Sequence, residues 1–348
     1  MRQYKHLKKK SHGGALLVGR ALSLLGITLA LILAILLGVI WVLEKGPSPT
    51  VTELFCRSVR ETSAVRWVAN IFLSDEEIDQ LKSQNTESMA TDAVNTSLIR
   101  IQPGVQTGGE AGVEEEAAME LIDISEGTIK GKLLIVKDPS RVILGTSDNL
   151  GQQAGLQLTD MVAKYDGVAG VNAGGFNDEN GRGNGGVPQG LVITDGEMVW
   201  GSAWATYNVI GFDANHILHV GTMTGQEAMD LGMQYGVSFV THDGLASSLI
   251  INGEVQYSNL ASGVNPRTAI GQRADGAVLL LVLDGRSINT LGATMEDICN
   301  VMLDYDAVNV GNLDGGSSSV MVYEGEIINS CASVTGPRNI PTGFIVLK

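Results

Sequence analysis

The strongest chemical pattern in the sequence is a run of small polar residues at the end of an apolar segment, NVGNLDGGSSSVM at residues 309–321. Asp314 would stand at the end of a strand, where a rigid scaffold presents a carboxylate. Successive N–H groups in such a turn can form an anion-binding nest, and hydroxyls add donors. The residues that would supply these donors are Gly315, Gly316, Ser317 and Ser318. A plain hairpin turn with solvated serines is the competing interpretation.

A second polar cluster follows the apolar residues 168–171. It begins with Asn172 and two glycines, Gly174 and Gly175, and continues through Phe176 into a loop rich in Asn, Asp and Gly. Glycines allow the backbone to approach a ligand closely. The loop does not have the spacing of an EF-hand, because Phe176 and Val187 occupy positions that need Asp and Glu. An ordinary surface loop remains the alternative.

Three arginines lie next to further turns in this acidic chain. Arg267 begins an apolar segment, Arg286 follows Asp284 at the end of another, and Arg338 lies in a Gly-Pro-Arg-Asn turn. A guanidinium can form two parallel hydrogen bonds to a phosphate or a carboxylate. The alternatives are an internal ion pair for Arg267 and a plain turn at Asp284.

Other kinds of active site find less support. The sequence contains neither the Gly-x-Ser-x-Gly elbow of serine hydrolases nor the Gly-Lys-Ser/Thr of a phosphate-binding loop. His216 and His219 are three residues apart, which does not suit two metal ligands on one strand face. His242 and Asp243 could form an acid–base pair or could simply be loop residues.

The elements that would position these side chains are mostly strands. Two helices are predicted, at residues 224–232 and 294–305, and the turns at 195–197 and 252–254 predict hairpins. The strand-like runs are separated by Gly, Asn and Asp turns. They are Ile129–Val136, Val142–Leu144, Gly190–Thr194, Asn208–Phe212, Val237–Val240, Ser248–Ile251, Ala277–Leu283, Ala307–Val310, Val320–Tyr323 and Gly343–Leu347. This pattern predicts an α+β fold with mixed or antiparallel sheets and few helices.

One transmembrane helix is predicted before this fold. Residues 21–43 carry no charge and are long enough to cross a hydrocarbon core of about 30 Å. The basic tip at residues 1–20 predicts a cytoplasmic N-terminus and an extracytoplasmic remainder. A cleaved signal peptide is the alternative, but no small-residue cleavage site follows. The remaining divisions are a partly helical juxtamembrane segment at 44–83, a polar linker at 84–118 and a catalytic domain at 119–348.

Composition and charge exclude several classes of function. The chain of 348 residues has a net charge of −15, with basic residues concentrated at its N-terminus. Nucleic-acid binding needs basic patches on the folded surface, so no nucleic-acid partner is expected. Three cysteines do not form a disulfide framework. No cofactor is specified by the sequence, although the acidic composition leaves a divalent cation as a candidate and its ligands unknown.

Four motifs in this order resemble the phosphodiester glycosidase family. They are Asn172-Ala-Gly-Gly-Phe176, Arg267-Thr-Ala-Ile-Gly271, Gly292-Ala-Thr-Met-Glu-Asp297 and Asn312-Leu-Asp-Gly-Gly-Ser-Ser318. Ala173 and Ser317 replace glycines of the family pattern, and the long loop after Phe176 is a further departure. The resemblance covers about residues 165–348. It implies hydrolysis of a sugar-1-phosphodiester, with release of the free sugar and a phosphomonoester.

The resemblance and the residue chemistry together assign roles. Asp314 is the first candidate for the catalytic carboxylate and Asp284 the second, since glycoside cleavage needs a carboxylate to activate water or to stabilise an oxocarbenium-like centre. The residues expected to bind substrate are Asn172, Gly174, Gly175, Phe176, Arg267, Thr268, Arg286, Asn312, Gly315, Gly316, Ser317, Ser318 and Arg338.

The expected substrate is a phosphorylated glycan or glycolipid at a cell surface or in the cell envelope, reached by an enzyme anchored in the cell membrane. One alternative is a non-catalytic module that binds phosphoglycans during exopolysaccharide or cell-envelope assembly. Another is a metal-dependent hydrolase of a different ester, which would be inactivated by a chelator.

Overall fold

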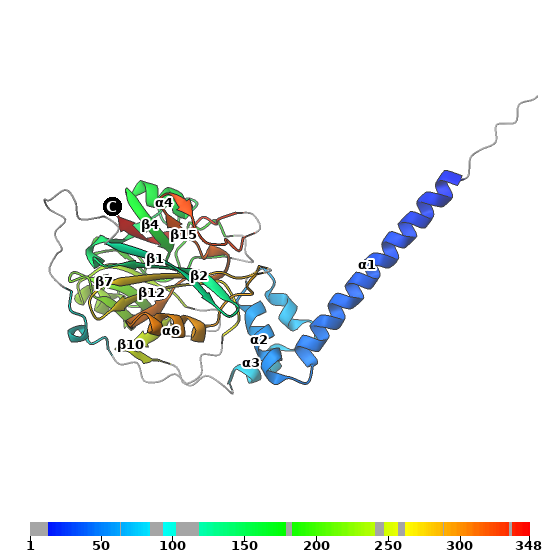
Figure 1. Ribbon diagram of the computed structural model, residues 1–348, viewed down its shortest axis with the longest axis horizontal. Helices are drawn as coiled ribbons and strands as arrows, with labels where there is room; N and C mark the ends of the chain where they lie inside the picture. Colours follow the sequence, from blue (N-terminus) through cyan, green and yellow to red (C-terminus); the bar gives the residue numbers. More distant parts are fainter. Residues whose placement is uncertain are drawn as a thin grey trace, which may run out of the picture.

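The computed structural model describes residues 13–62, 64–83, 93–101, 118–178, 183–240, 247–256, 262–287, 289–333 and 336–348. A long N-terminal helix and a small helical unit precede a body built on three sheets (Figure 1). Every strand pair described is antiparallel, so the predicted α+β fold is confirmed. Residues 1–12 of the basic tip, most of the predicted linker, and His242 and Asp243 lie outside the described residues.

The N-terminal helices follow from capping and hydropathy. Helix α1 (Gly13–Lys45) contains an apolar stretch, Leu17–Lys45, that could cross a membrane by length and composition. Helix α2 (Pro49–Arg60) begins after Ser48, whose hydroxyl accepts from the Val51 N–H. Helix α3 (Asp75–Ser83) has a capping box in which Ser74 and Glu77 each accept the other's N–H. Figure 1 places α2 and α3 between α1 and the body.

The largest sheet has seven strands and carries two of the predicted motifs. Its β12–β14 pair brings the arginine motif next to the strand that precedes Asp314. In spatial order its strands are β1 (Met119–Glu126), β2 (Ile129–Val136), β13 (Val278–Leu283), β12 (Arg267–Arg273), β14 (Ala307–Asn312), β10 (Ser248–Ile251) and β11 (Glu254–Val255).

Two five-stranded sheets complete the body. One has the order β16 (Glu326–Ile327), β15 (Met321–Tyr323), β4 (Gly167–Asn172), β17 (Thr342–Leu347) and β3 (Val142–Thr146). The other has the order β6 (Glu197–Trp200), β5 (Val192–Thr194), β9 (Met233–Ser238), β7 (Thr206–Asp213) and β8 (Leu218–Thr224). Strand β4 ends at Asn172, so the second predicted motif lies at a strand end.

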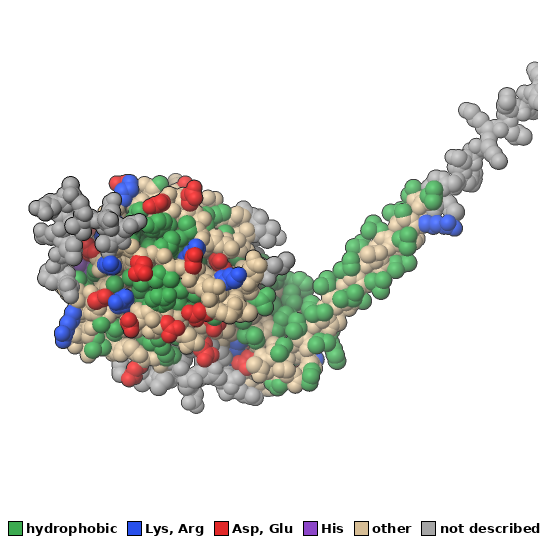
Figure 2. Space-filling view, in the orientation of Figure 1, with side chains coloured by type: hydrophobic (Ala, Val, Ile, Leu, Met, Phe, Trp, Pro, Cys, Tyr) green, Lys and Arg blue, Asp and Glu red, His purple; other side chains and the backbone are tan. Residues whose placement is uncertain are grey.

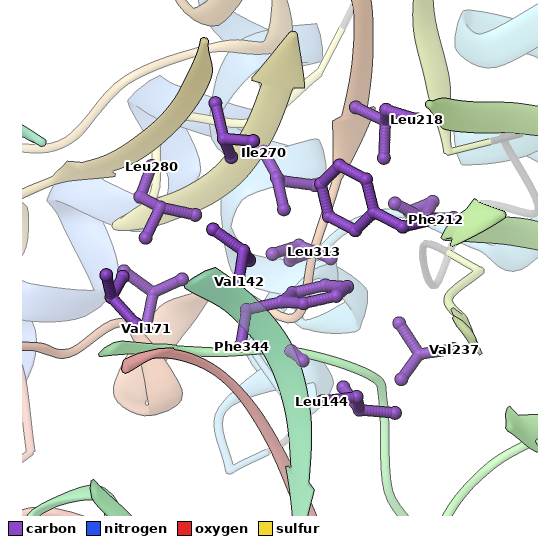
Figure 3. Packing of buried hydrophobic residues seen from close by; sticks show 14 of the residues in the cluster. Val142, Leu144, Val171, Phe212, Leu218, Val237, Ile270, Leu280, Leu313 and Phe344 are labelled. Atoms are coloured by element: carbon purple, nitrogen blue, oxygen red, sulfur yellow. The ribbon is translucent and has the colours of Figure 1, made fainter. Parts of the chain in front are cut away.

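The three sheets share one central core. Side chains from all three sheets pack together there, with Phe212 and Phe344 edge to face at 6.1 Å between ring centroids (Figure 3). Leu313 belongs to this core, and Asp314 follows it directly. The candidate carboxylate therefore directly follows a residue of the central core.

Short helices cover the outer faces of the sheets. Helix α6 (Met295–Asp304) packs on the seven-stranded sheet and begins with a capping box formed by Thr294 and Asp297. Helices α4 (Leu158–Lys164) and α5 (Gly225–Asp230) cover the other two sheets. The predicted hairpin at 252–254 has φ of 56° at Asn252 and 83° at Gly253, as a two-residue turn requires.

Part of the predicted linker lies on the body. The Asn95 N–H donates to the Asn252 side chain at 2.7 Å, and the Arg100 N–H donates to the Ala274 carbonyl at 2.8 Å. Ile99 is buried in this contact. Residues 93–101 are thus docked on the sheet edge, although the Ser/Thr-rich composition around them predicts a linker.

Candidate active site

Asp314 is held at a strand end by backbone contacts on both sides. Its N–H donates to the Ala173 carbonyl at 2.9 Å, and its own carbonyl accepts from Nδ2 of Asn172 at 2.5 Å. Leu313, immediately before it, is buried in the core. These contacts fix the backbone of the turn without using the Asp314 carboxyl.

Asn172 is a positioning residue for this turn. Its Oδ1 accepts from the Thr268 hydroxyl at 2.9 Å and from the Val320 N–H at 3.1 Å. Asn172 and Thr268 are both buried. The two residues were expected to bind substrate, and the structure places them beneath the turn, where they join three strands.

The glycine turn itself leaves little room for side chains. A Cβ on Gly315 would lie 2.9 Å from the Pro266 carbonyl oxygen. Gly316 has φ of +65°, and a Cβ there would approach the Arg286 guanidinium to 3.2 Å. The turn therefore needs glycine at both positions because the arginine segment packs directly against it.

Most N–H groups of the expected anion nest already donate to backbone carbonyls of the fold. The Gly316 N–H donates to Pro266 at 2.8 Å, and the N–H groups of Ser318 and Ser319 donate to Gly315 and Gly316 at 3.2 and 3.3 Å. The first bond ties the turn to the arginine segment, and the other two close the short helix η6 (Gly316–Ser318). The donors that face the site are therefore chiefly arginine side chains.

The pKa of the Asp314 carboxyl is raised well above its usual value. Burial, and to a smaller extent the negative charge of Asp178, raise its pKa, which lies at about 7. A hydrogen bond with Ser318, the positive charge of Arg338 and the Gly315 N–H oppose this rise. A carboxyl that titrates near pH 7 can exchange a proton during a reaction at neutral pH.

One end of the site is formed by Arg338, Asp178 and Phe176, and is called here the Arg338 end. Nη1 and Nη2 of Arg338 donate to the two carboxylate oxygens of Asp178 at 2.5 and 2.8 Å. The guanidinium lies over the Phe176 ring, 4.9 Å from its centroid. The hydrogen bonds to Asp178 raise the pKa of Arg338. The positive charge of Arg338 in turn lowers the pKa of Asp314.

The other end is formed by Arg267, Arg286 and Asn265, and is called here the Arg267 end. Arg286 lies beside Gly316 and donates to Oδ1 of Asn265 at 2.9 Å. Asn265 and Arg267 both donate to Oε2 of Glu61. Burial and the charge of Arg267 lower the pKa of Arg286. Arg286 also has φ of 53°, an uncommon backbone for a residue with a side chain. Two cations are thus held close together, which suits an anionic ligand.

An acidic side chain from the juxtamembrane segment occupies the Arg267 end. Oε2 of Glu61 accepts from Arg267 at 2.7 Å and from the Asn265 amide at 2.9 Å, while Oε1 accepts from the Gly263 N–H at 2.7 Å. Thr62 accepts from Nη2 of Arg286 at 2.7 Å. A carboxylate held by an arginine, an amide and an N–H resembles a bound anion.

Asp284 and Asn312 lie in different surroundings. One carboxylate oxygen of Asp284 accepts from Asn329 at 3.2 Å and from the Ser330 N–H at 2.9 Å, and burial raises its pKa. Asp284 thus holds the loop after β16. Asn312 is buried at the end of β14, and its Oδ1 contacts no hydrogen-bond donor among the described residues.

Gly174 and Gly175 serve packing. The Gly174 N–H donates to the Thr342 hydroxyl at 3.1 Å, and a Cβ on Gly175 would lie 3.1 Å from the Phe239 ring. Within the described part of the chain, no group of three His, Cys, Asp or Glu side chains could hold a metal ion.

Sequence reasoning missed three side chains at the site: Asp178, Asn265 and Glu61. Asp178 and Asn265 lie within or beside the predicted motifs, so their polar type was the available signal. Glu61 follows α2 and is separated from Arg267 by 206 residues. No local pattern indicates a pairing over that distance.

All four sequence motifs and Arg338 lie in a part of the chain that matches a known protein family. The sequence model of the family described as phosphodiester glycosidase matches residues 165–347, which is more than half of the chain. The match includes Asp314, Arg267 and Arg338 and excludes Glu61.

Individual relatives cover the chain to different extents. The SPbeta prophage-derived uncharacterized protein YomE of Bacillus subtilis (strain 168) is 29% identical over 294 residues, covering 82% of this chain and 41% of that protein. Human N-acetylglucosamine-1-phosphodiester alpha-N-acetylglucosaminidase is 27% identical over 162 residues, covering 42% of this chain and 31% of the enzyme. The chain thus spans less than half the length of these relatives.

A solved structure has a similar fold. The zebrafish N-acetylglucosamine-1-phosphodiester alpha-N-acetylglucosaminidase catalytic domain, described as auto-inhibited by its pro-peptide, superposes with a TM-score of 0.55 at 18% identity. The superposition covers 76% of this chain and 87% of that domain. This likeness concerns the fold.

Proposed function

The chain belongs to the phosphodiester glycosidase family, and on that premise we propose that it hydrolyses the glycosidic bond of sugar-1-phosphodiesters. The observation that carries the proposal is the Asp314 carboxyl, whose pKa of about 7 reflects burial beside Arg338, in a turn whose Gly316 packs against the Arg286 guanidinium. A phosphodiester is anionic, and its sugar carbon needs an activated water. The site offers cations for the first need and a titratable carboxyl for the second.

In the proposed reaction Asp314 acts as a general base. Water attacks the anomeric carbon, one of its protons passes to the Asp314 carboxylate, and the remaining hydroxyl becomes part of the free sugar. The bond between the anomeric carbon and the phosphate oxygen breaks, and its electron pair leaves with the phosphomonoester. The guanidinium of Arg267 or Arg286 would bind the phosphate oxygens and stabilise the charge that accumulates there.

The remaining site residues have supporting roles in this proposal. Asn172 and Thr268 hold the turn in register, and Asp178 orients Arg338 beside Asp314. Asp284 positions the loop at Asn329 and Ser330 and takes no part in the reaction. Phe176 supports the guanidinium of Arg338 from one side.

We also propose that the protein is anchored in a membrane by α1. The helix is apolar over Leu17–Lys45, and basic residues precede the span, which favours a cytoplasmic N-terminus and an extracytoplasmic body. The substrate would then be a phosphodiester-linked glycan or glycolipid on the outer side. The segments at 44–83 and 84–118 would connect the anchor to the catalytic domain at 119–348.

Glu61 suggests a closed form of this enzyme. The zebrafish relative is described as auto-inhibited by its pro-peptide, and here the segment after α2 fills the Arg267 end. We propose that Glu61 competes with the phosphate of the substrate for Arg267 and Asn265. The segment must move for substrate to bind, and its displacement would activate the enzyme.

The test is turnover of α- and β-linked hexosyl and N-acetylhexosaminyl phosphodiesters by the full chain in detergent micelles, with and without EDTA. Free sugar and new phosphomonoester in equal amounts, both lost in Asp314→Asn, are the expected result. Release of a sugar phosphate would contradict cleavage at the anomeric carbon.

Two other outcomes of the same assay would favour the alternatives. Binding of a phosphoglycan without turnover by the unmodified protein would favour a binding module. Complete loss of activity in EDTA, restored by a divalent cation, would favour a metal-dependent hydrolase.

A further inference from the structure

Large apolar side chains are exposed in one short stretch of the helical unit. Within residues 49–72 the exposed fractions are 64% for Trp67, 46% for Val51, 41% for Val65, 38% for Leu54 and 37% for Phe72. We call these five residues the juxtamembrane patch. Figure 2 shows hydrophobic side chains continuing from α1 onto the adjoining unit.

The patch does not result from a poorly packed unit. The unit has its own buried cluster, in which Cys56, Ala69 and Ile78 are each about 1% exposed or less. The exposed residues therefore lie on the surface of a folded unit. Several large apolar side chains exposed next to a membrane-spanning helix mark a surface that contacts another apolar phase.

The patch is tied to the end of α1. The Phe72 N–H donates to Oε2 of Glu44 at 2.8 Å, and the Lys45 ammonium pairs with Glu77 at 2.7 Å. Glu44 is buried in this contact. Because both ties lie at the last turn of α1, the patch is held where the span would leave the hydrocarbon.

We propose that the juxtamembrane patch docks on the interfacial layer of the bilayer that α1 crosses. This inference rests on the proposed membrane anchoring. Tryptophan and phenylalanine are favoured at the interface, where a ring can contact acyl chains while the backbone stays hydrated. The partner is the lipid surface because the patch continues from the membrane span and is fixed to its end.

Docking would also place the active site at the lipid surface. The patch residues Val65 and Trp67 follow Glu61 and Thr62, which contact the Arg267 end. The charge of Arg66 acts on Asp178 at the Arg338 end. In the docked form the segment would contact the site through Glu61 and Thr62 and the membrane through Val65 and Trp67, which favours lipid-linked sugar phosphodiesters as the substrate class.

The experiment uses the tryptophans as depth reporters. The chain has four, at positions 41, 67, 200 and 204. Three variants of the full chain each keep one tryptophan, at position 41, 67 or 204, with phenylalanine at the other three positions. They are reconstituted in phosphatidylcholine and phosphatidylglycerol vesicles, with and without a lipid that carries a doxyl quencher near the headgroup.

Trp41 reports insertion of α1, and Trp204, which is 84% exposed on the body, is the aqueous control. The proposal predicts that Trp41 and Trp67 emission is quenched at least twofold, while Trp204 emission is unchanged. Adding Val65→Glu and Phe72→Glu to the Trp67 variant should abolish its quenching.

Three results would overturn the proposal. If Trp41 is quenched and Trp67 is not, the helix is inserted but the patch faces water or another protein. If neither is quenched, α1 does not anchor the chain. If Trp204 is quenched as strongly as Trp67, the patch is not the docking surface. Fluorescence requires no turnover, so failure of the proposed hydrolysis would leave these results unaffected.

Discussion

The two ends of the proposed active site each contain an arginine–carboxylate pair. At each end an arginine is bound by a carboxylate, Arg338 by Asp178 and Arg267 by Glu61. The side chains are similarly buried, with exposed fractions of 14% and 16% in the first pair and 7% and 9% in the second. Two hydrogen bonds join the first pair and one joins the second, but burial does not distinguish the pairs.

The two pairs differ in whether the carboxylate lies within the part of the chain that matches the family. Asp178 lies within residues 165–347, which match the family, and its negative charge helps to set the acidity of Asp314. Glu61 lies outside the match, in the segment that joins the anchor to the body. We infer that the Arg338 pair is part of the catalytic apparatus, whereas the Glu61 pair is a removable cover. The predictions below test this difference.

The largest effect is expected at Asp314, the proposed general base. Asp314→Asn should lower kcat by about 10²–10⁴-fold, the range usual for loss of a general base. The matched control is Asp284→Asn, because Asp284 is also a half-buried carboxyl with a raised pKa at a strand end. A loss at Asp284 as large as that at Asp314 would refute the assignment of the base.

Neutralising the two partner carboxylates should have opposite effects. Glu61→Gln should raise kcat/KM about tenfold, mainly through a lower KM, because the cover binds Arg267 less tightly. Asp178→Asn should lower kcat/KM by about tenfold, because Arg338 loses its orienting partner. A tenfold change corresponds to about 1.4 kcal/mol. Steady-state kinetics of both variants on one substrate would measure these changes. If kcat/KM changed in the same direction in both variants, the two carboxylates would not have different roles.

The pH profile should report Asp314. Because the base acts in its ionised form, activity should rise with pH and level off above a pKa of about 7. Asp178→Asn removes a negative neighbour, so the rising limb should move to lower pH. Glu61→Gln should leave the limb in place. A limb that moved equally in both variants would indicate that the two ends are electrostatically equivalent.

The smallest effect concerns stability. The pKa of Asp314 is raised in the folded protein, so the fold favours the neutral carboxyl and loses that stability as pH rises through about 7. Asp314→Asn should therefore raise Tm at pH 8 by roughly 2–4 °C and change it little at pH 5. Thermal unfolding at both pH values would measure this. A lower Tm at pH 8 would mean that the carboxylate stabilises the fold.

Local patterns predicted much of the fold. The runs Ile129–Val136 and Ser248–Ile251 coincide with β2 and β10, and the predicted helix at 294–305 matches α6 and its capping box. Helix α4 was missed because it has seven residues and Gln157 makes no side-chain cap. The strand predicted at Val237–Val240 is β9, which runs from Met233 to Ser238.

The contacts within the candidate site were harder to predict from the sequence than the fold. The residue types at 172–176, 267 and 312–318 predicted one site, because glycine turns and strand ends are local features, and the structure brings these three segments together. The partners of the arginines were not indicated, since 160 residues separate Asp178 from Arg338. Asn172 was expected to contact substrate because it is polar, but its amide is buried and holds the Asp314 turn.

The most direct test of the account is the fate of water oxygen during hydrolysis. The full chain would turn over a defined sugar-1-phosphodiester in H₂¹⁸O, and ³¹P NMR with mass spectrometry would locate the label. Attack at the anomeric carbon predicts an unlabelled phosphomonoester together with free sugar. A phosphate that contains ¹⁸O would show attack at phosphorus and would contradict the role proposed for Asp314.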